Sequence, residues 1–454
     1  MASVARVADP MTTALTPAGH VHSYWAATVG PGPDNVRPLP GDRTVEVAVI
    51  GGGYTGLSAA YRLAGTHGIE TLVLEANRIG WGASGRNGGI CSITFGKVPL
   101  ARRIAEWGVE ATRRALEIGV EAVALVRHLI TTEGIACDAT ANGYVQVAHR
   151  PERVADLQAR LALYRGPLRY DGVDFLDRER LEREGHLRGP SAHGGLWFRD
   201  VFGLHPLKCV NGLALAAMRQ GALVHERSPV VAWGRDGAHH VLATPTGRVR
   251  ARRVIVATNG YTPERLHPHF RGRLLAATSN IIVTRPLGPA EWQDVGSLRP
   301  QCYADTRDLL FYWRRLPDDR MLFGGRAGLV NTPSSLRRRR RWLEAQMAAK
   351  FPVLAGVGGE YFWYGNVCLS YDLMPHVGAA DEDSTVVYAL AYLGNGVSIA
   401  TYSGGLAADL AAGKDVPRDT PLTAARLPRF PLPLLRRLYL AGAYLVYGVK
   451  DRWL

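Results

Sequence analysis

The first feature that points to chemistry is a group of glycines directly after an apolar segment. Residues 44–50 (Thr-Val-Glu-Val-Ala-Val-Ile) run into Gly51, Gly53 and Gly56. A buried parallel strand followed by glycines at this spacing is typical of a turn that binds a dinucleotide pyrophosphate at a helix N-terminus. Gly51 is expected to make the tight turn and Gly53 to let the backbone approach the phosphates. Gly56 is expected to let the following helix pack closely on the strand.

A carboxylate follows at the distance that this motif requires. The pattern predicts a helix over residues 57–64 and a second strand over residues 69–74, which ends at Glu75. An acid at this point accepts a hydrogen bond from a ribose 2′-OH, so the sequence favours FAD or NAD over NADP. The neighbours of the glycines and of the acid are expected to line the same nucleotide site: Tyr54, Thr55 and Ala76.

Further glycine-containing turns lie far apart in the sequence, at residues 82–89, 257–261 and 394–396. The strand and helix patterns between them predict that the chain enters one nucleotide-binding domain three times, with a second domain inserted between the visits. A nicotinamide dehydrogenase usually keeps its two βαβ halves contiguous. The interleaving therefore favours an extended FAD over NAD.

Composition narrows the class of protein. A chain of 454 residues is too long for one core. The five cysteines are scattered and form no C-x-x-C pair, which predicts a reducing, cytoplasmic location and no metal site. The net charge of +14 is spread along the chain except at residues 337–341. These five arginines lead into a helical pattern, so we expect a solvated helix face and no nucleic-acid partner.

The sequence predicts no membrane-spanning segment. The longest nearly uninterrupted apolar run, residues 438–449, contains Gly442 and Gly448 and is shorter than the roughly 18 residues that a span needs. We predict that this run forms a buried strand or helix, with a membrane-surface element as the alternative. The first thirty residues lack the charged start and apolar core of a secretory signal.

Several motifs occur together in a fixed order: Ser-Tyr-Trp at 23–25, Val-Ile-Gly-Gly-Gly-Tyr-Thr-Gly-Leu at 49–57, Gly-Ala-Ser-Gly-Arg-Asn-Gly-Gly at 82–89, Ala-Thr-Asn-Gly-Tyr at 257–261, Leu-Phe-Gly-Gly at 322–325, Met-Pro-His-Val-Gly at 374–378 and Gly-Asn-Gly-Val at 394–397. In this order they resemble the D-amino-acid oxidase superfamily of FAD-dependent oxidoreductases, and within it the γ-glutamylputrescine-oxidase-like branch. The resemblance extends from about residue 23 to residue 413.

This resemblance implies an α/β fold. A glutathione-reductase-type FAD-binding Rossmann domain is expected to be interleaved with an α+β substrate domain built on an antiparallel or mixed sheet. The expected divisions are an N-terminal arm at 1–43, an FAD-binding domain at 44–98, 203–270 and 371–413, a substrate domain at 99–202 and 271–370, and a C-terminal extension at 414–454.

The resemblance also implies which residues hold FAD. Three further groups are expected to join the first glycine turn, along the pyrophosphate and flavin, at the adenine and at the pyrimidine end. They are Gly82, Ala83, Ser84, Gly85, Arg86, Asn87, Gly88 and Gly89; Val230 or Val231 with Ala257, Thr258, Asn259 and Gly260; and Gly394, Asn395, Gly396 and Val397. Cys368 lies near, but not at, the position of the cysteine that tethers flavin in sarcosine oxidases. Non-covalent FAD is therefore expected.

The implied reaction is oxidation of a small-molecule amine. Hydride leaves the C–H next to nitrogen for flavin N5, water hydrolyses the resulting imine, and O2 is the expected acceptor, giving H2O2. Four residues are candidates for contact with the substrate or the flavin ring: Arg86, Asn87, Tyr312 and Arg326. A surface ion pair is the alternative for Arg326, and core packing is the alternative for Tyr312.

Two departures from the superfamily pattern bear on the substrate. Val367 stands where amino-acid oxidases commonly carry an arginine that clamps the substrate carboxylate, which favours an amine without an adjacent carboxylate. The strand at 320–326 lacks the flavin-side lysine of sarcosine oxidases, which leaves an acceptor other than O2 open. Two alternatives also stay open: an unusual amino or imino acid held by another arginine, and a flavoprotein subunit without turnover. The sequence does not decide the oligomeric state.

Overall fold

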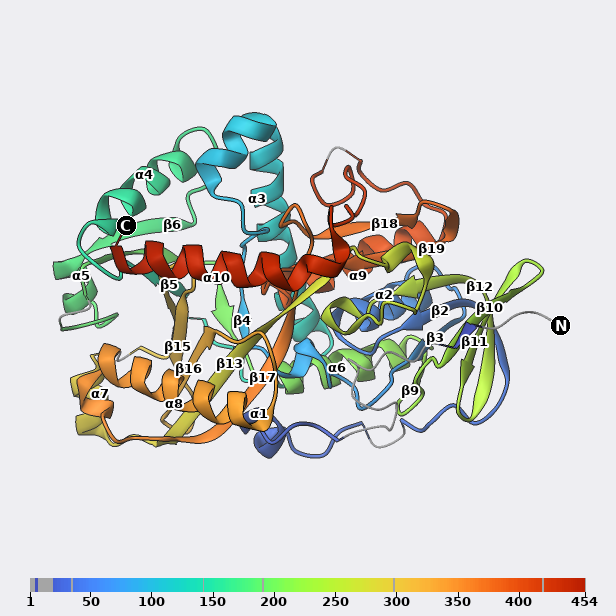
Figure 1. Ribbon diagram of the computed structural model, residues 1–454, viewed down its shortest axis with the longest axis horizontal. Helices are drawn as coiled ribbons and strands as arrows, with labels where there is room; N and C mark the ends of the chain where they lie inside the picture. Colours follow the sequence, from blue (N-terminus) through green and yellow to red (C-terminus); the bar gives the residue numbers. More distant parts are fainter. Residues whose placement is uncertain are drawn as a thin grey trace.

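The computed structural model describes residues 5–6, 19–33, 36–141, 143–189, 192–296, 299–418 and 420–453. Two large sheets lie side by side along the longest axis of the molecule, one at each end (Figure 1). Within the described residues, one sheet has nine strands and the other has eight. A short third sheet pairs β4 (Ile90–Cys91) with β8 (Phe202–Gly203) between them.

The nine-stranded sheet is assembled from distant parts of the chain. Its parallel strands lie in the order β9 (Leu223–His225), β3 (Thr71–Leu74), β2 (Arg43–Ile50), β12 (Gly247–Val256) and β19 (Asp383–Leu390). Antiparallel strands extend this core: β1 (Ala5–Arg6), β10 (Ala232–Asp236), β11 (His239–Thr244) and β18 (His376–Ala380). Residues 47–50 of β2 are all buried, as expected for a strand that is covered on both faces.

Helices cover one face of this sheet. They are α2 (Tyr54–Gly65), α6 (Pro206–Arg219) and α9 (Ser398–Ala411), and the long helix α3 (Leu100–Thr132) packs against α9. Gly108 interrupts α3 with a positive φ of 81°. A second cluster packs buried side chains of the strands, such as Ala48 and Ile50, against Leu39, Phe270 and Leu427. The short 3-10 turns of the chain lie at 83–85, 259–261, 268–270, 352–354 and 433–435.

The eight-stranded sheet is mixed. Its order is β17 (Gly359–Leu369), β13 (Leu275–Pro286), β16 (Arg320–Arg326), β15 (Phe311–Arg315), β14 (Cys302–Asp305), β5 (Tyr144–Val147), β7 (Gly194–Phe198) and β6 (Val173–Asp177). Only β14 and β5 pair in parallel within this described sheet. Helices α7 (Pro289–Val295) and α8 (Pro333–Lys350) cover one face, while α4 (Arg153–Arg165) and α5 (Arg178–Arg183) lie at the β6 and β7 end.

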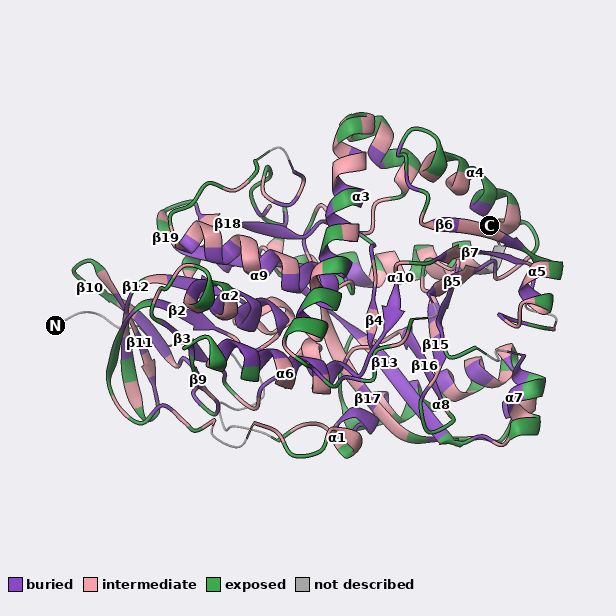
Figure 2. Ribbon diagram, turned by 180° about the vertical axis from the view of Figure 1, so that it is seen from behind, coloured by how far each residue is buried: buried purple, intermediate pink, exposed green. Residues whose placement is uncertain are grey.

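The two sheets confirm the predicted α/β architecture, with a Rossmann-type sheet interleaved with a mixed sheet. The strands of both sheets are largely buried, and the outward faces of α3 and α4 are exposed (Figure 2). The limits of the domains remain a prediction. Helix α3 was assigned to the substrate domain, and the strands of the second sheet follow it in the sequence, but it packs against α9 of the predicted FAD-binding domain.

Much of the predicted N-terminal arm, residues 1–4, 7–18 and 34–35, lies outside the described residues. The rest of the arm is docked on the molecule. Helix α1 (Tyr24–Thr28) is capped by the Ser23 side chain, and both Tyr24 and Trp25 are buried.

The prediction for residues 438–449 was partly wrong. They form a helix, α10 (Arg436–Trp453), but this helix is not buried: Leu438 is 64% exposed and Leu445 is 73% exposed. Only its inner face packs on the molecule, so an apolar composition did not translate into burial. No helix in the described part of the chain combines the length and apolarity needed to cross a bilayer.

Candidate cofactor and substrate site

The turn after β2 has the tight geometry that its glycines predict. The Gly51 amide donates to the carbonyl of Leu74 (2.9 Å), and Gly51 has a φ of +113°. A Cβ on Gly51 would lie 2.9 Å from the Ala257 carbonyl oxygen, and a Cβ on Gly56 would lie 2.0 Å from the Gly51 oxygen. A side chain at Gly56 would therefore force α2 away from the strand, as expected from the motif.

Glu75 closes the same turn from the end of β3. Its carboxylate accepts hydrogen bonds from the amides of Gly52 (2.7 Å) and Asn77 (2.9 Å). Burial raises the pKa of the Glu75 carboxyl to about 7. The carboxylate thus lies beside the glycine turn, where a ribose hydroxyl of a bound dinucleotide could donate to it.

The second glycine-rich loop lies directly against the first. The Tyr54 amide donates to Ser84 Oγ (3.0 Å), and a Cβ on Gly53 would lie 2.7 Å from the same oxygen. This contact brings residues 51–56 and 82–89 together into one cradle, although about thirty residues separate them in the sequence.

Asn87 is committed to the shape of its own loop. Its amide nitrogen donates to the carbonyls of Ala83 (3.1 Å) and Ser84 (2.9 Å), and its amide oxygen accepts from Gly89 (2.7 Å). Since these bonds occupy both ends of the side-chain amide, we assign Asn87 to holding the loop rather than to contact with a substrate.

Arg86 is buried and only partly satisfied. Its guanidinium stacks 4.1 Å from the centre of the Trp81 ring, and Nε donates to the Trp81 carbonyl (2.7 Å). Nη2 is buried and has no hydrogen-bond partner among the described residues. Buried donors are nearly always paired in folded proteins, so this one indicates room for an acceptor on a bound group.

One face of the eight-stranded sheet lies on this loop. Residues directly opposite each other in antiparallel strands share a face, and the register pairs Tyr312 with Gly324 and Ser279 with Arg326. A Cβ on Gly88 would lie 2.7 Å from the Tyr312 ring. Tyr312 therefore packs between its own sheet and the loop at 82–89, and its contact with a substrate or the flavin stays a prediction.

Arg326 lies on the same face, at the end of β16. Its Nη2 donates to the Leu393 carbonyl (2.6 Å) and would lie 2.8 Å from a Cβ on Gly394. That Cβ would also lie 3.9 Å from Val367 Cγ1. Burial lowers the pKa of the Arg326 guanidinium, and no carboxylate of the described residues is paired with it, so the alternative of a surface ion pair is not supported. Arg326 and Val367 instead meet at the turn that was predicted to hold the pyrimidine end of the flavin.

Sequence reasoning missed two cationic residues near this face. Burial and the nearby Arg326 guanidinium lower the pKa of Lys97 to about 7. Arg314 is buried and donates to the carbonyls of Gly89 (3.2 Å) and Leu204 (2.7 Å), which fixes the loop to the sheet. A signal for Lys97 was present, because the chain uses arginine for nearly all of its basic residues and keeps few lysines.

The remaining predicted cofactor residues surround the same cradle. The Ser228 amide donates to the Glu75 carbonyl (2.8 Å), so the segment leading to Val230 lies beside Glu75. The Val231 amide is engaged by the carbonyl of Ala243 (2.8 Å), which favours Val230 for the contact with adenine. The Asn259 side chain accepts from the Ala391 amide (2.9 Å) and thereby joins the turn at 257–261 to the loop at 391–397.

Tyr54 and Thr55 can face a nucleotide only with their backbone. The Tyr54 hydroxyl donates to the Pro206 carbonyl (2.8 Å), and the Thr55 hydroxyl lies 2.8 Å from that of Tyr392. Both side chains are buried against neighbouring elements. At the other end, Val397 is the N-cap of α9, so the partial positive charge of this helix terminus points toward residues 394–397.

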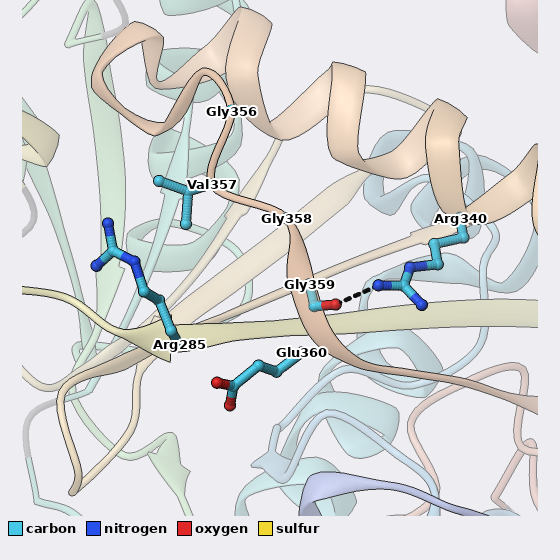
Figure 3. A pocket seen from close by; sticks show the side chains of 7 residues that line it. All are labelled: Arg285, Arg340, Gly356, Val357, Gly358, Gly359 and Glu360. Atoms are coloured by element: carbon cyan, nitrogen blue, oxygen red, sulfur yellow. Dashed lines mark hydrogen bonds between the residues drawn. The ribbon is translucent and has the colours of Figure 1, made fainter.

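A surface hollow elsewhere on the second sheet does not share this chemistry. It is lined by Arg285, Arg340, Glu360 and residues 356–359, at the far ends of β13 and β17 (Figure 3). Arg285 is paired with Glu291, Arg340 with Glu344, and Glu360 with Arg320. These charges are already neutralised by partners on the protein. The glycines among the lining residues, Gly356, Gly358 and Gly359, lead into β17 and do not join a strand to a helix N-terminus.

Comparison with known proteins agrees with this geometry. The model of the FAD dependent oxidoreductase (DAO) family matches residues 46–410. The chain belongs to this family. It is 32% identical to γ-glutamylputrescine oxidoreductase of Escherichia coli (strain K12), over 95% of this chain and 99% of that protein. It is 31% identical to the probable oxidoreductase OrdL of Rhizobium meliloti (strain 1021), over 95% of this chain and 98% of that protein.

The fold is also similar to a solved structure, that of glycine oxidase from Geobacillus kaustophilus. The TM-score is 0.67 at 20% identity, covering 82% of this chain and 96% of that one. The predictions of an FAD-dependent oxidoreductase and of its family are therefore confirmed. The residues present fit FAD: the cradle at Gly51, Gly53 and Gly56 admits no side chain, and Glu75 and the free Arg86 Nη2 offer polar groups along it.

Proposed function

We propose that this protein oxidises the C–N bond of an amine whose far end carries an acidic or strongly polar group. The observation that carries the proposal is the sheet face that holds Tyr312, Val367 and Arg326, which lies against the loops at 82–89 and 393–394. An apolar wall and a positive charge lie side by side next to the turn at 393–394, which supports a substrate site there.

FAD, when bound in the cradle, supplies the acceptor for the hydride that leaves the carbon next to nitrogen. The protein's own residues bind and orient the amine. The Tyr312 ring and Val367 form an apolar wall that keeps water from the reacting carbon and favours the neutral amine. Arg326 and Lys97 attract the polar end of the substrate and so fix which carbon faces the flavin.

The cofactor is proposed to be held without a covalent bond. Cys368 lies on β17 near Val367, but it is buried, and burial raises the pKa of its thiol to about 12. A thiol that stays protonated is a poor nucleophile. The supporting observation is therefore that no reactive thiolate is available at this position.

Two cations near one turn support an anionic group on the substrate. Arg326 forms no ion pair within the described residues, and Lys97 is half-buried beside it. Asp308 and Asp451 also act on Lys97, but more weakly than Arg326 does. Because desolvated cations are costly without a counter-charge, a substrate carboxylate would improve the electrostatics of this site.

The position of Arg326 also favours the second candidate, an unusual amino or imino acid. Val367 cannot bind a carboxylate, yet Arg326 lies beside the same turn. The two candidates differ in the distance between the oxidised carbon and the acid. The E. coli relative is named for γ-glutamylputrescine, a compound with an amine at one end and a glutamyl group at the other. We propose a substrate of this general kind, with the acid remote from the amine.

Anaerobic bleaching of the bound flavin tests the proposal. The panel compares simple diamines, their γ-glutamyl amides, N-alkyl glycines and free amino acids. We expect the γ-glutamyl amides to bleach the flavin at lower concentration than the parent diamines. Arg326→Ala should remove this preference, whereas Arg337→Ala, which changes an exposed arginine on α8, should leave it intact.

Other outcomes would correct the proposal in defined ways. Bleaching by N-alkyl glycines or free amino acids alone would establish the second candidate. A flavin that no compound bleaches would favour a subunit without turnover. Admitting air to the bleached protein then tests O2 as the acceptor, which we propose: rapid return of the colour with release of H2O2 supports an oxidase, and slow return supports a dehydrogenase.

A further inference from the structure

The outer face of α10 is apolar and exposed. Leu438, Leu445, Val446 and Val449 are 64%, 73%, 53% and 56% exposed. The inner face holds Leu440, which is buried, and half-buried residues that follow it at helical spacing, such as Tyr444. An amphipathic helix normally turns its apolar stripe inward, so the outward stripe on α10 requires another explanation.

The apolar surface continues beyond the helix. In the turn before α10, Leu434 is 98% exposed and Leu435 is 43% exposed. The Phe430 ring meets the Tyr371 ring edge-on and the Tyr439 ring at a tilt, at centroid distances of 5.5 and 6.1 Å, and both tyrosines are exposed. Clusters of exposed apolar side chains can mark a binding site for protein or membrane.

The charges of this segment have one sign. Residues 420–454 contain six basic residues and a single acidic one, Asp451. Asp451 is turned inward, where its carboxylate accepts hydrogen bonds from the amides of Asp308 (2.7 Å) and Leu309 (2.9 Å). Lys450, near the C-terminal end of α10, is exposed, while Arg426 and Arg436 are paired with Asp381 and Glu264 outside this segment. An apolar stripe in a segment with a net positive charge matches an anionic lipid surface.

A second copy of the chain fits this face less well. In a twofold dimer the same patch meets itself, so two segments of net positive charge would face each other. The segment's one acidic side chain is bound to the amides of residues 308 and 309, so it does not face outward toward a partner copy. A membrane rich in anionic lipid presents the opposite charge to the whole segment.

The orientation of α10 suits a helix that lies in the plane of a membrane. Figure 1 shows it running across the front of the molecule, from the region of α9 to the strands at the β5 end. We propose that α10 and the turn before it dock flat on an anionic membrane surface, with Leu434, Leu438, Leu445, Val446 and Val449 in the interfacial layer.

Vesicle flotation of the full-length, flavin-loaded protein tests this proposal. We expect the protein to float with phosphatidylcholine vesicles that contain phosphatidylglycerol, and to bind at least tenfold more weakly to vesicles of phosphatidylcholine alone. The variant Leu445→Asp/Val449→Asp should lower binding to the anionic vesicles at least tenfold. Lys450→Glu should weaken the preference for anionic lipid.

Leu215→Asp is the matched control, because Leu215 is an exposed leucine on α6, away from α10 (42% exposed). It should leave flotation unchanged, and equal flavin content and Tm should show that all variants are folded. The proposal is overturned if the wild-type protein does not float, or if the control and the α10 variant float equally. It is also overturned if the α10 variant instead dissociates a dimer of the wild-type chain, since a second copy would then cover the patch.

Discussion

The two sheets present different kinds of atoms to the candidate site. On the nine-stranded sheet, glycines, backbone amides and one buried carboxylate form the cradle. On the eight-stranded sheet, the facing atoms belong to large side chains such as Tyr312, Val367 and Arg326. Backbone geometry can bind the same cofactor in many proteins, whereas side chains decide which molecule meets it. The first region therefore indicates the family, and the second holds the specificity.

The largest expected effect is on the cradle. Gly56→Ala places a Cβ 2.0 Å from the Gly51 carbonyl oxygen, and we expect it to destabilise the protein by about 3 kcal/mol or more and to abolish flavin binding. The matched change Gly442→Ala, on the exposed α10 with nothing within 4 Å, should instead stabilise its helix by about 0.5–1 kcal/mol. Tm and the flavin-to-protein absorbance ratio measure both. Equal Tm values would show that the close packing of α2 is not needed.

The second-largest expected effect concerns the buried carboxylate of Glu75 and its contribution to FAD binding. Glu75→Gln removes a charged acceptor, and we expect the Kd for FAD to rise about tenfold or more, because a hydrogen bond to a charged group contributes about 1.5–3 kcal/mol. Glu70→Gln is the control, because Glu70 is an exposed carboxylate directly before β3, and it should leave the Kd for FAD unchanged. Fluorescence titration of the flavin-free protein gives both values.

The pH dependence of FAD binding separates charge from shape at this position. The pKa of Glu75 is raised to about 7, so the carboxyl is neutral below that pH and ionised above it. The affinity of the wild-type protein for FAD should therefore fall as the pH drops through about 7. In Glu75→Gln this dependence should disappear. A variant that keeps it would assign the titration to another group.

The smallest expected effect concerns the substrate region. The pKa of Lys97 is lowered to about 7, so its ammonium is charged below that pH and neutral above it. For an acidic amine, KM of the wild-type enzyme should rise as the pH increases through about 7. Lys97→Met should raise KM up to about tenfold at low pH and remove this dependence, while Lys414→Met, at an exposed lysine, should not. Steady-state kinetics across pH decides whether Lys97 acts on the substrate.

The sequence was informative where chemistry depends on local spacing. Gly51, Gly53, Gly56 and Glu75 lie within one βαβ unit, so the strand, turn and acid could be recognised together. The second glycine loop was also found, but its details were not: the Asn87 amide proves to hold the loop, which only its three hydrogen bonds show. A side chain's type does not reveal which of its partners the fold will supply.

The exposure of the C-terminal helix is a second feature that the sequence did not predict. The composition of residues 438–449 favoured a buried element, yet the helix packs on one side only. The prediction named a helix only as one of two possibilities, a buried strand or a buried helix. The sequence could not show that one face of this helix has no neighbour among the described residues, because burial depends on elements from other parts of the chain.

The amino-acid sequence by itself determined the nucleotide-binding unit, the interleaved α/β fold and the oxidoreductase family, since glycine spacing and strand patterns are local properties. The tertiary structure decided that Arg326 meets Val367 at the turn of Gly394, and that Lys97 stands nearby. Strand register brings Arg326 and Val367 to one face of the sheet, and the packing of two loops brings Gly394 and Lys97 to them. Specificity in this protein is therefore a property of long-range contacts.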